Sequence, residues 1–337
     1  MNHRFQLLSV LLLVLVFITQ VRAETVTLVA GGAGADGGPA NQAKLAKPFG
    51  LIFDQAGNLY IGQYGTKTDG HQVRKVDTKG IITTIAGTGK VGAAGDGGPA
   101  INGEFNGIHD VVIGADGNLY IADSFNRKVR KIDLKTGILT TFAGTGEGKA
   151  ATGDGGPADK AALDGVASLW FSKDGATLYL SGFSKFVRTV DMKTRIISKL
   201  SDCPGGRSIA VDSKGNLYIA GGTTLRVRTP DGKVKVLVDD THLAGSDLPL
   251  ASNPKHLGID AQDNVLICDE QHHLLRTSLP AQDRLVTIMG DGKPGANGVD
   301  GPPAQAQLKS PHGVLFHHGA IYVADSGNDR VLKISAE

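Results

Sequence analysis

Residues 108–144, with the sequence IHDVVIGADGNLYIADSFNRKVRKIDLKTGILTTFAG, decide the fold. The stretch holds four short segments rich in β-branched or aromatic residues, separated by turn residues. Asp116-Gly117-Asn118 supplies the first turn, because Gly and Asn adopt positive φ at low cost. We expect four strands, at Asp110–Ile113, Leu119–Ala122, Val129–Ile132 and Ile138–Phe142. One four-stranded meander cannot bury both of its faces, so it needs neighbours of the same kind.

Those neighbours are visible as copies of the segment GNLYIA. Close copies stand at residues 57–62 and 215–220, and weaker ones at residues 176–180, 264–268 and 320–324. Four-stranded units that recur about every 40–50 residues are the sequence sign of a β-propeller. The chain is therefore predicted to be all-β, with six blades that use residues 24–337 as one domain.

The copies resemble NHL repeats. In that pattern a D-x-x-G-N-L-Y-I-A-D segment is followed by N-x-R-V-x-K and a closing T-x-A-G, and residues 108–144 meet it almost in full. The copy that begins near residue 49 meets it nearly as well. The resemblance implies an NHL propeller over nearly all of the chain after residue 23, but no single function, because propellers host many.

The first 23 residues read as a secretory signal peptide. Arg4 provides a positive start, Leu7 to Ile18 is apolar, and Val21-Arg22-Ala23 offers small residues for cleavage before Glu24. The alternative is a membrane anchor, but this apolar run is short against the roughly 20 residues of a membrane span. We expect a secreted or periplasmic protein.

Charge excludes two classes of partner. The chain has 35 Lys and Arg against 33 Asp and Glu, and two of the basic residues, Arg4 and Arg22, lie in the predicted signal peptide. The mature protein is then formally neutral and carries no basic block, which argues against nucleic acid and anionic membranes as partners. We expect a monomer whose ligand is a protein, peptide or glycan.

The two ends of the chain complement each other. Residues 24–31 match the closing strand of a blade but follow no other strands, whereas residues 314–335 supply three strands and no fourth. We infer that the N-terminal strand completes the last blade and closes the ring.

The connections between blades are uneven. The blades that begin near residues 49, 109, 167 and 312 follow long connections with a Gly/Asp-rich turn before Pro, plausible sites for one helical turn. The blades near residues 207 and 256 follow short or degenerate ones, Asp202–Gly206 and Gly245–Pro249. The rim of the channel should therefore be lopsided. No Gly-Lys-Ser/Thr follows any glycine-rich run, so a phosphate loop is excluded.

One end of the ring collects the candidate ligand-binding residues. In an up-and-down meander the start of the innermost strand, the loop between the second and third strands and the incoming connection share one end. The first residues of the innermost strands should surround the mouth of the central channel. We place these residues at the mouth: Phe49, His109, Ser168, Arg207, His256 and His312, with Asp110, Asp123, Asp269 and Asp325 beside them.

Three of the ten histidines, His109, His256 and His312, are predicted to take equivalent positions in different copies. Imidazoles that converge on an axis can hold a divalent metal, zinc or calcium, with nearby carboxylates completing or orienting the shell. In the alternative, they hydrogen-bond loops or a neutral ligand, because metal–ligand distances of about 2 Å demand tight convergence. Both interpretations stay open.

A second resemblance bears on this site. The chain is distantly similar to peptidyl-hydroxyglycine amidating lyases and to gluconolactonase-like propellers. The zinc-binding histidines of the lyases follow Pro at the start of inner strands, as His312 follows Pro311, whereas His109 and His256 lack that proline. Those lyases also use an arginine and a tyrosine, so the resemblance implies Arg207 and Tyr64 as candidate catalytic residues.

The Asp-Ser-x-Asn loops and the two cysteines are expected to have structural roles. The segments Asp123–Arg127 and Asp325–Arg330 recur with the repeat and should join neighbouring blades, with Asp accepting from backbone amides and Arg pairing with a carboxylate. Cys268 takes a slot held by Ala in other copies, and Cys203 lies in the turn into the fourth blade; a disulfide between them is left open.

Two functions follow from these residues. The first is a secreted or periplasmic binding module that uses the loop-rich face. The alternative is a metal-dependent lyase or lactonase-like hydrolase with its metal at the channel mouth. The sequence leaves open whether the protein is an enzyme.

Overall fold

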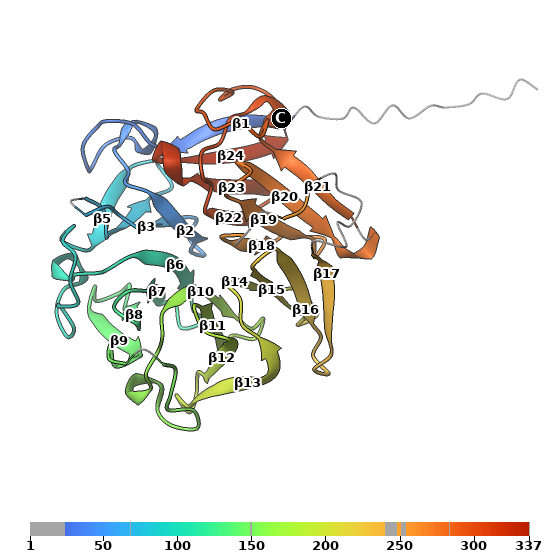
Figure 1. Ribbon diagram of the computed structural model, residues 1–337. Helices are drawn as coiled ribbons and strands as arrows, with labels where there is room; N and C mark the ends of the chain where they lie inside the picture. The colour runs from blue at the N-terminus through green and yellow to red at the C-terminus, as the bar shows by residue number, and fades with distance from the viewer. Residues whose placement is uncertain are drawn as a thin grey trace, which may run out of the picture.

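Six four-stranded antiparallel sheets form a ring in the computed structural model, as Figure 1 shows. It describes residues 24–67, 69–148, 150–239, 248–250, 254–282 and 284–336, so the predicted signal peptide lies outside the described residues. The predicted six-bladed all-β propeller is confirmed. The blades, each given from its innermost strand outward, are as follows: blade 1, β2 (Pro48–Phe53), β3 (Leu59–Gln63), β4 (Val73–Val76) and β5 (Ile82–Ala86); blade 2, β6 (Ile108–Ile113), β7 (Leu119–Asp123), β8 (Lys128–Ile132) and β9 (Leu139–Ala143); blade 3, β10 (Val166–Phe171), β11 (Thr177–Gly182), β12 (Phe186–Asp191) and β13 (Ile197–Pro204); blade 4, β14 (Ser208–Val211), β15 (Leu217–Gly221), β16 (Thr224–Arg228) and β17 (Val234–Val238); blade 5, β18 (Leu257–Ile259), β19 (Val265–Asp269), β20 (Leu274–Leu279) and β21 (Arg284–Met289); blade 6, β22 (Gly313–His317), β23 (Ala320–Asp325), β24 (Arg330–Ala336) and β1 (Glu24–Ala30).

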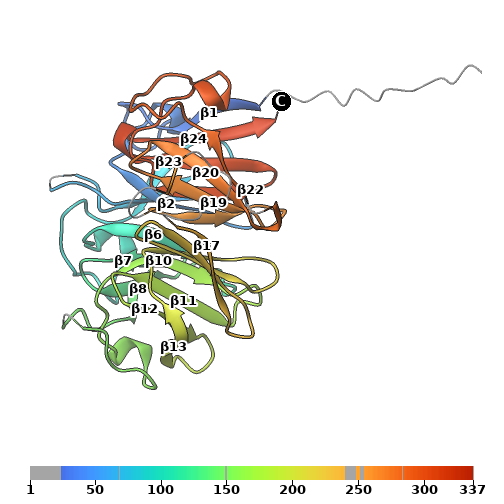
Figure 2. The same cartoon turned by 45° about the vertical axis from the view of Figure 1, so that its right-hand side comes forward.

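The N-terminal strand closes the ring as predicted. β1 pairs antiparallel with β24, with Val26 opposite Ile334 and Leu28 opposite Leu332, and the two strands lie side by side in Figures 1 and 2. Val26 is fully buried. Blade 6 therefore contains strands from both ends of the chain, and the connection from β1 to β2 joins it to blade 1.

The innermost strands of blades 6, 1 and 2 approach one another closely because glycine stands at two contact points. A Cβ on Gly313 would lie 1.8 Å from the Phe49 carbonyl oxygen, and one on Gly50 would lie 2.6 Å from the Val111 amide nitrogen. Neither position can hold a larger residue without moving a strand.

Short 3₁₀ turns lie within four of the connections between blades, where the sequence predicts a helical turn. They are η1 (Ala40–Gln42), η2 (Ala100–Asn102), η3 (Ala158–Lys160) and η5 (Pro303–Gln305). In three of them the proline precedes the first helical residue instead of occupying it; only η5 has Pro inside its first turn. Gly245–Pro249, the expected connection into blade 5, lies largely outside the described residues.

Apolar clusters fill the spaces between blades. Tyr120 and Phe142 of blade 2, for example, pack in one buried cluster with Leu169 and Leu178 of blade 3. Both cysteines are buried and free, so the open alternative of a disulfide is not realised. Cys203 belongs to β13, where the sequence predicted a turn, because the outer strand of blade 3 runs on to Pro204.

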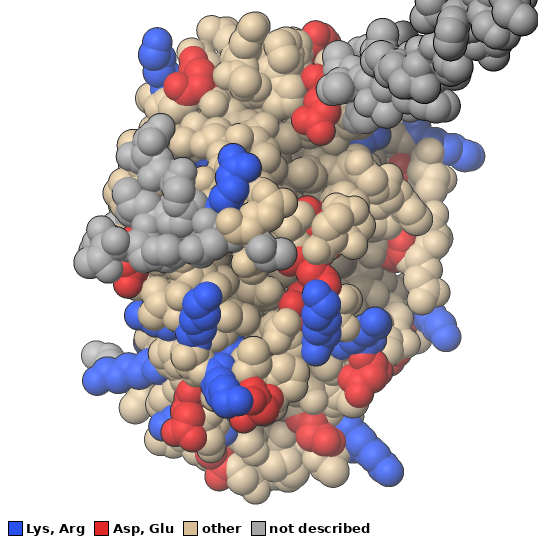
Figure 3. Space-filling model, turned by 90° about the vertical axis from the view of Figure 1, so that its right-hand side faces the viewer, with Lys and Arg blue, Asp and Glu red and all other residues tan. Residues whose placement is uncertain are grey.

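Positive and negative side chains are interspersed over the face drawn in Figure 3, with no field of one sign. Within the described residues, no helix has the length and apolar character needed to cross a membrane.

Candidate functional site: the mouth of the central channel

The strand registers correct the predicted set of mouth residues. Asp110 lies opposite Ala122 in blade 2, and Ser208 lies opposite the equivalent Ala220 in blade 4. In blade 5 Leu257 lies opposite Ile267, as Val111 lies opposite Ile121 in blade 2. His256, the residue before Leu257, is therefore the equivalent of Asp110 and not of His109. Ser168 has the same register as Asp110. Ser168 and His256 therefore lie one residue deeper in the channel than predicted.

The inner strands thus present two successive layers of residues. In order from blade 1 to blade 6, the mouth layer is Phe49, His109, Ala167, Arg207, Lys255 and His312, and the deeper layer is Gly50, Asp110, Ser168, Ser208, His256 and Gly313. The sequence missed Lys255 because the weak fifth copy was aligned one residue out of register.

One side of the mouth is an aromatic collar. The Phe49 ring stacks on the rings of Tyr64 and His312, with centroids 4.5 and 3.7 Å apart. The His109 ring makes edge-on contacts, with centroid distances of 5.0–6.0 Å, to four rings: Phe49, Tyr64, Phe125 and Phe183. We call these six residues the collar: Phe49, Tyr64, His109, Phe125, Phe183 and His312. They come from blades 6, 1, 2 and 3, the side with the long connections. Phe125 and Phe183 remain 47% and 46% exposed, so the collar presents apolar ring surface to solvent.

The other side of the mouth, from blades 4 and 5, is charged. The Arg207 guanidinium lies 5.5 Å from the centroid of the Phe183 ring, and Lys255 Nζ lies 3.0 Å from Glu270 Oε2. Arg207 Nε is buried and has no hydrogen-bond partner among the described atoms. Burial lowers the pKa of Arg207, while the charge of Glu270 opposes the shift. The mouth is therefore amphipathic, with aromatic rings facing a buried arginine whose Nε has no hydrogen-bond partner among the described atoms.

His109 and His312 are held in the same way in their two blades. Nδ1 of His109 lies 3.1 Å from the Gly107 carbonyl oxygen, and Nδ1 of His312 lies 3.2 Å from that of Ser310. A carbonyl only accepts, so Nδ1 carries the proton and Nε2 is the acceptor of each neutral ring. Burial and the charge of Arg207 lower the pKa of His109 to about 3, and burial lowers that of His312 well below its usual range.

The three histidines that the sequence grouped as metal ligands are not brought together. His256 Nε2 lies 3.1 Å from Asp110 Oδ1 in the deeper layer, whereas His109 and His312 lie in the collar. Within the described part of the chain, no three His, Cys, Asp or Glu side chains are grouped so that they could hold a metal ion. Two neutral imidazoles are one ligand short of the three protein ligands of a catalytic zinc site.

The other predicted acidic residues serve the scaffold. Asp123 accepts from the Asn106 amide at 2.8 Å and pairs with Arg130 at 3.3 Å. Asp325 accepts from the Lys309 amide at 2.7 Å and pairs with Arg330 at the same distance, and Asp269 pairs with Arg276 at 3.1 Å. These aspartate contacts stay within one blade and its incoming connection. The predicted bond to the neighbouring blade is made by the serines, because Ser124 donates to the Val166 carbonyl and Ser326 to that of Pro48. Arg130 replaces Arg127, which ends its turn with φ 52°.

A hollow of about 520 Å³ adjoins the collar between the loops of blades 1 and 2. Tyr64 and Phe125 are collar residues that also line this hollow, and Lys47 and Lys67 line it too. The mouth therefore extends sideways into a groove that carries additional positive charge.

Comparison with known proteins bears on the family. Residues 29–94 match the family model of the Teneurin NHL domain. The chain is 25% identical over 275 residues to NHL repeat-containing protein 2 of Gallus gallus, which covers 65% of this chain and 37% of that protein. It is 24% identical over 356 residues to Teneurin-4 of Homo sapiens, covering 87% of this chain and 12% of that one. The fold is a six-bladed β-propeller, and these matches support an NHL type.

Solved structures share the fold of this NHL-type propeller at low sequence identity. An auxiliary nutrient binding protein from Bacteroides thetaiotaomicron has a TM-score of 0.69 at 15% identity and covers 94% of this chain and 77% of its own. A virginiamycin B lyase from Staphylococcus aureus with quinupristin has a TM-score of 0.59 at 12% identity, covering 93% and 99%. A putative gluconolactonase has a TM-score of 0.57 at 11% identity, covering 94% and 97%. At these identities the neighbours show the shared propeller fold alone.

Proposed function

We propose that this propeller is an exported binding module that holds an acidic oligosaccharide at the channel mouth. The observation that carries the proposal is the pairing of solvent-exposed rings with Arg207, 5.5 Å from the Phe183 centroid. A uronate ring has a flat apolar face and a carboxylate on the same six-membered ring, so one sugar can stack on the collar and form charge-assisted hydrogen bonds with the guanidinium. The groove beside Tyr64, with Lys47 and Lys67, has room for the next sugars.

The chemistry of the collar histidines favours binding over catalysis. With a pKa of about 3, His109 is too weak a base to abstract a proton efficiently near pH 7. The free Nε2 atoms of His109 and His312 are instead suited to accept hydrogen bonds from sugar hydroxyls. A metal-dependent lyase or lactonase needs a third ligand beside these two, and the described geometry offers none.

Calorimetry with a matched pair of ligands tests the binding function. Trigalacturonate should bind wild-type protein, and its neutral methyl ester should bind at least tenfold more weakly, because a hydrogen bond to a charged group contributes about 1.5–3 kcal/mol. Arg207→Met should abolish the preference for the acid, and Phe183→Ala should weaken both ligands. Lys235→Met, an exposed change on β17, is the control. Equal affinity for acid and ester, or no binding of either, would rule out this ligand class.

Export is tested separately by the N-terminus of the protein recovered outside the cytoplasm. The signal peptide predicted for residues 1–23 supports export, and cleavage after Ala23 would leave Glu24 as the first residue, at the start of β1. N-terminal sequencing should therefore begin at Glu24. A chain recovered intact and only from membranes would favour the anchor alternative instead.

A further inference from the structure

The incoming connections cover the outermost strands of blades 1, 2, 3 and 6. In blade 1 the backbone of Ile82, on β5, donates to the Gly38 carbonyl at 3.0 Å and accepts from the Gly37 amide at 2.8 Å. The other three blades repeat this pair of bonds at the outer-strand residues Leu139, Ile197 and Val26. All four of these strand residues are fully buried. The connections therefore close sheet edges that would otherwise be open to pairing with another chain.

β17, the outermost strand of blade 4, lies on the outside of the ring (Figure 1) and has no such cover among the described residues. The connection into blade 4 consists of residues 205–207, whereas residues 87–107 lead into blade 2. Three residues span at most roughly 11 Å, and the innermost and outermost strands of a four-stranded sheet are about 14 Å apart. The short connection thus cannot extend over β17.

The backbone of β17 offers its hydrogen-bonding groups to the outside. Val234 has the register in blade 4 that Ile82 has in blade 1, and Thr229 donates to the carbonyl of Lys233, the preceding residue, at 2.9 Å. Because hydrogen-bonded pairs alternate along an antiparallel ladder, the N–H and C=O groups of Val234 and Val236 face away from β16. No hydrogen bond from another described segment reaches them.

The side chains along this edge are exposed as well. Val234 and Val236 are each 39% exposed, in contrast to the fully buried residues on the covered strands. An open strand edge with apolar side chains is a template for a further strand, and proteins use such edges to bind extended segments.

The charges of the β16–β17 hairpin restrict the choice of partner. The hairpin holds four basic residues, Arg226, Arg228, Lys233 and Lys235, and one acidic residue, Asp231, which pairs with Lys233 at 2.8 Å. A second copy of the chain paired along β17 would bring like charges together, and lysines on an edge oppose such self-pairing. An acidic strand would instead gain opposite-charge pairs across the new ladder.

We propose that β17 is a docking edge for an extended acidic segment of another protein, which joins blade 4 as a fifth strand. The backbone of this segment pairs with Val234 and Val236, its apolar side chains pack on the two valines, and its carboxylates face Arg226 and Lys235. The edge lies on the outer rim of the ring, whereas the collar surrounds the channel mouth. Docking is therefore independent of the proposed sugar binding.

Fluorescence anisotropy with labelled peptides measures the docking. The probe is the capped peptide Glu-Val-Glu-Val-Asp-Val-Glu. One control peptide has Lys at every acidic position, and the other keeps the charge but has Pro at the central Val. The probe should bind with a stoichiometry of one, and both controls should bind at least tenfold more weakly, because the first repels the basic hairpin and the second loses a backbone donor.

Two variants locate the docking. Val234→Pro removes an outward-facing N–H, which an edge strand tolerates, and should weaken the probe at least tenfold. The double variant Arg226→Glu with Lys235→Glu should reverse the preference in favour of the Lys peptide, and this gain of binding requires a folded protein. Lys199→Glu, an exposed change on the covered strand β13, is the control and should leave probe binding unchanged.

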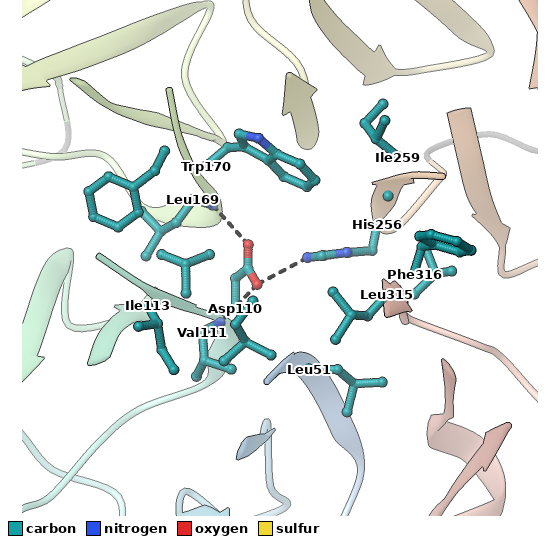
Figure 4. Close-up of a pocket in the computed structure, with 15 residues that line it drawn as sticks. Leu51, Asp110, Val111, Ile113, Leu169, Trp170, His256, Ile259, Leu315 and Phe316 are labelled. Carbon is teal, nitrogen blue, oxygen red and sulfur yellow. Dashed lines mark hydrogen bonds and ion pairs between the residues drawn. The ribbon is translucent and has the colours of Figure 1, made fainter. Parts of the chain in front are cut away.

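Trp170 reports whether the variants keep their fold. It is the single tryptophan of the chain, it lines the axial cavity drawn in Figure 4, and it packs against the buried residues Ile209 and Ala210 of blade 4. Its emission maximum should be the same in all variants, because none of them changes a residue of the inner strands.

Hydrogen exchange tests the open edge directly. In the free protein the Val234 amide should exchange at least tenfold faster than the Ile82 and Leu139 amides, and the probe should slow it. Equal protection of these amides in the free protein would show a covered edge and overturn the proposal, as would probe binding that survives both variants. Equal affinity for the acidic and the Lys peptide would overturn the acidic partner. A dimer that Val234→Pro dissociates would make a second copy the occupant instead.

Discussion

The pKa of each histidine along the inner strands depends on the group that its ring contacts. His109 and His312 donate to carbonyls and pack against Phe49, so burial keeps them neutral. His256 faces the Asp110 carboxylate and is favoured in its charged form. One residue along the inner strand separates the positions of His109 and His256, and that step reverses the direction in which the pKa of the imidazole shifts.

His109 should make the fold sensitive to acid. Its pKa is about 3 in the folded protein and about 6.5 in an unfolded chain, so between these values the unfolded chain binds more protons. The stabilisation present at pH 7.5 is lost as the pH falls below about 6.5. At pH 5 the loss is about 2 kcal/mol. Denaturant unfolding of His109→Phe should lack this part of the pH dependence; an unchanged slope between pH 7.5 and 5 would contradict the assignment.

At the scale of the element, one arginine on the third strand of a blade ties down the connection that leads into that blade. Arg74, Arg130 and Arg188 reach the aspartates of the three Gly-Asp-rich turns at 2.7, 3.0 and 2.8 Å. Each also donates to carbonyls of the same connection, as Arg188 does to Ala162 and Thr152. The aspartates, Asp36, Asp96 and Asp154, are therefore structural partners that tie each long connection to its own blade.

Arg130→Met should be strongly destabilising. Arg130 is fully buried and lies against Asp123, which is also fully buried. Removing one partner of a buried ion pair leaves an uncompensated charge, at a cost of about 3–5 kcal/mol. Lys135→Met in an exposed turn of the same blade is the control and should change stability by less than about 0.5 kcal/mol. Similar unfolding midpoints for the two variants would show that the pair does not matter.

For the whole molecule, closure of the ring determines the channel. β1 joins the two ends of the chain in blade 6, and Gly50 and Gly313 let the inner strands of blades 6, 1 and 2 meet. Blades 2 and 5 then face each other, and Asp110 reaches His256 across the axis.

A disulfide across the closing strands should stabilise the ring. Thr27 lies opposite Lys333 in the register of β1 and β24, so Thr27→Cys with Lys333→Cys should cross-link under oxidising conditions, while Cys203 and Cys268 stay buried and reduced. A bridge that closes a loop of this length gives up to about 5 kcal/mol in theory and commonly less. Oxidised protein should unfold at higher denaturant than the same protein with reductant. Failure to form the bridge would contradict the register.

The repeated GNLYIA segments by themselves determined the six blades, the complementary ends and the structural aspartate loops, because strand propensity, turn residues and repetition are local properties. They also placed Phe49, His109, Arg207 and His312 in one layer of the inner strands. Only the tertiary structure decided the depth of Ser168 and His256, since a weak repeat fixes its register through its partners and a slip of one residue moves a side chain to another layer. The collar itself joins loops from separate blades. Its combination of exposed rings with the Arg207 guanidinium exists only once the ring has closed.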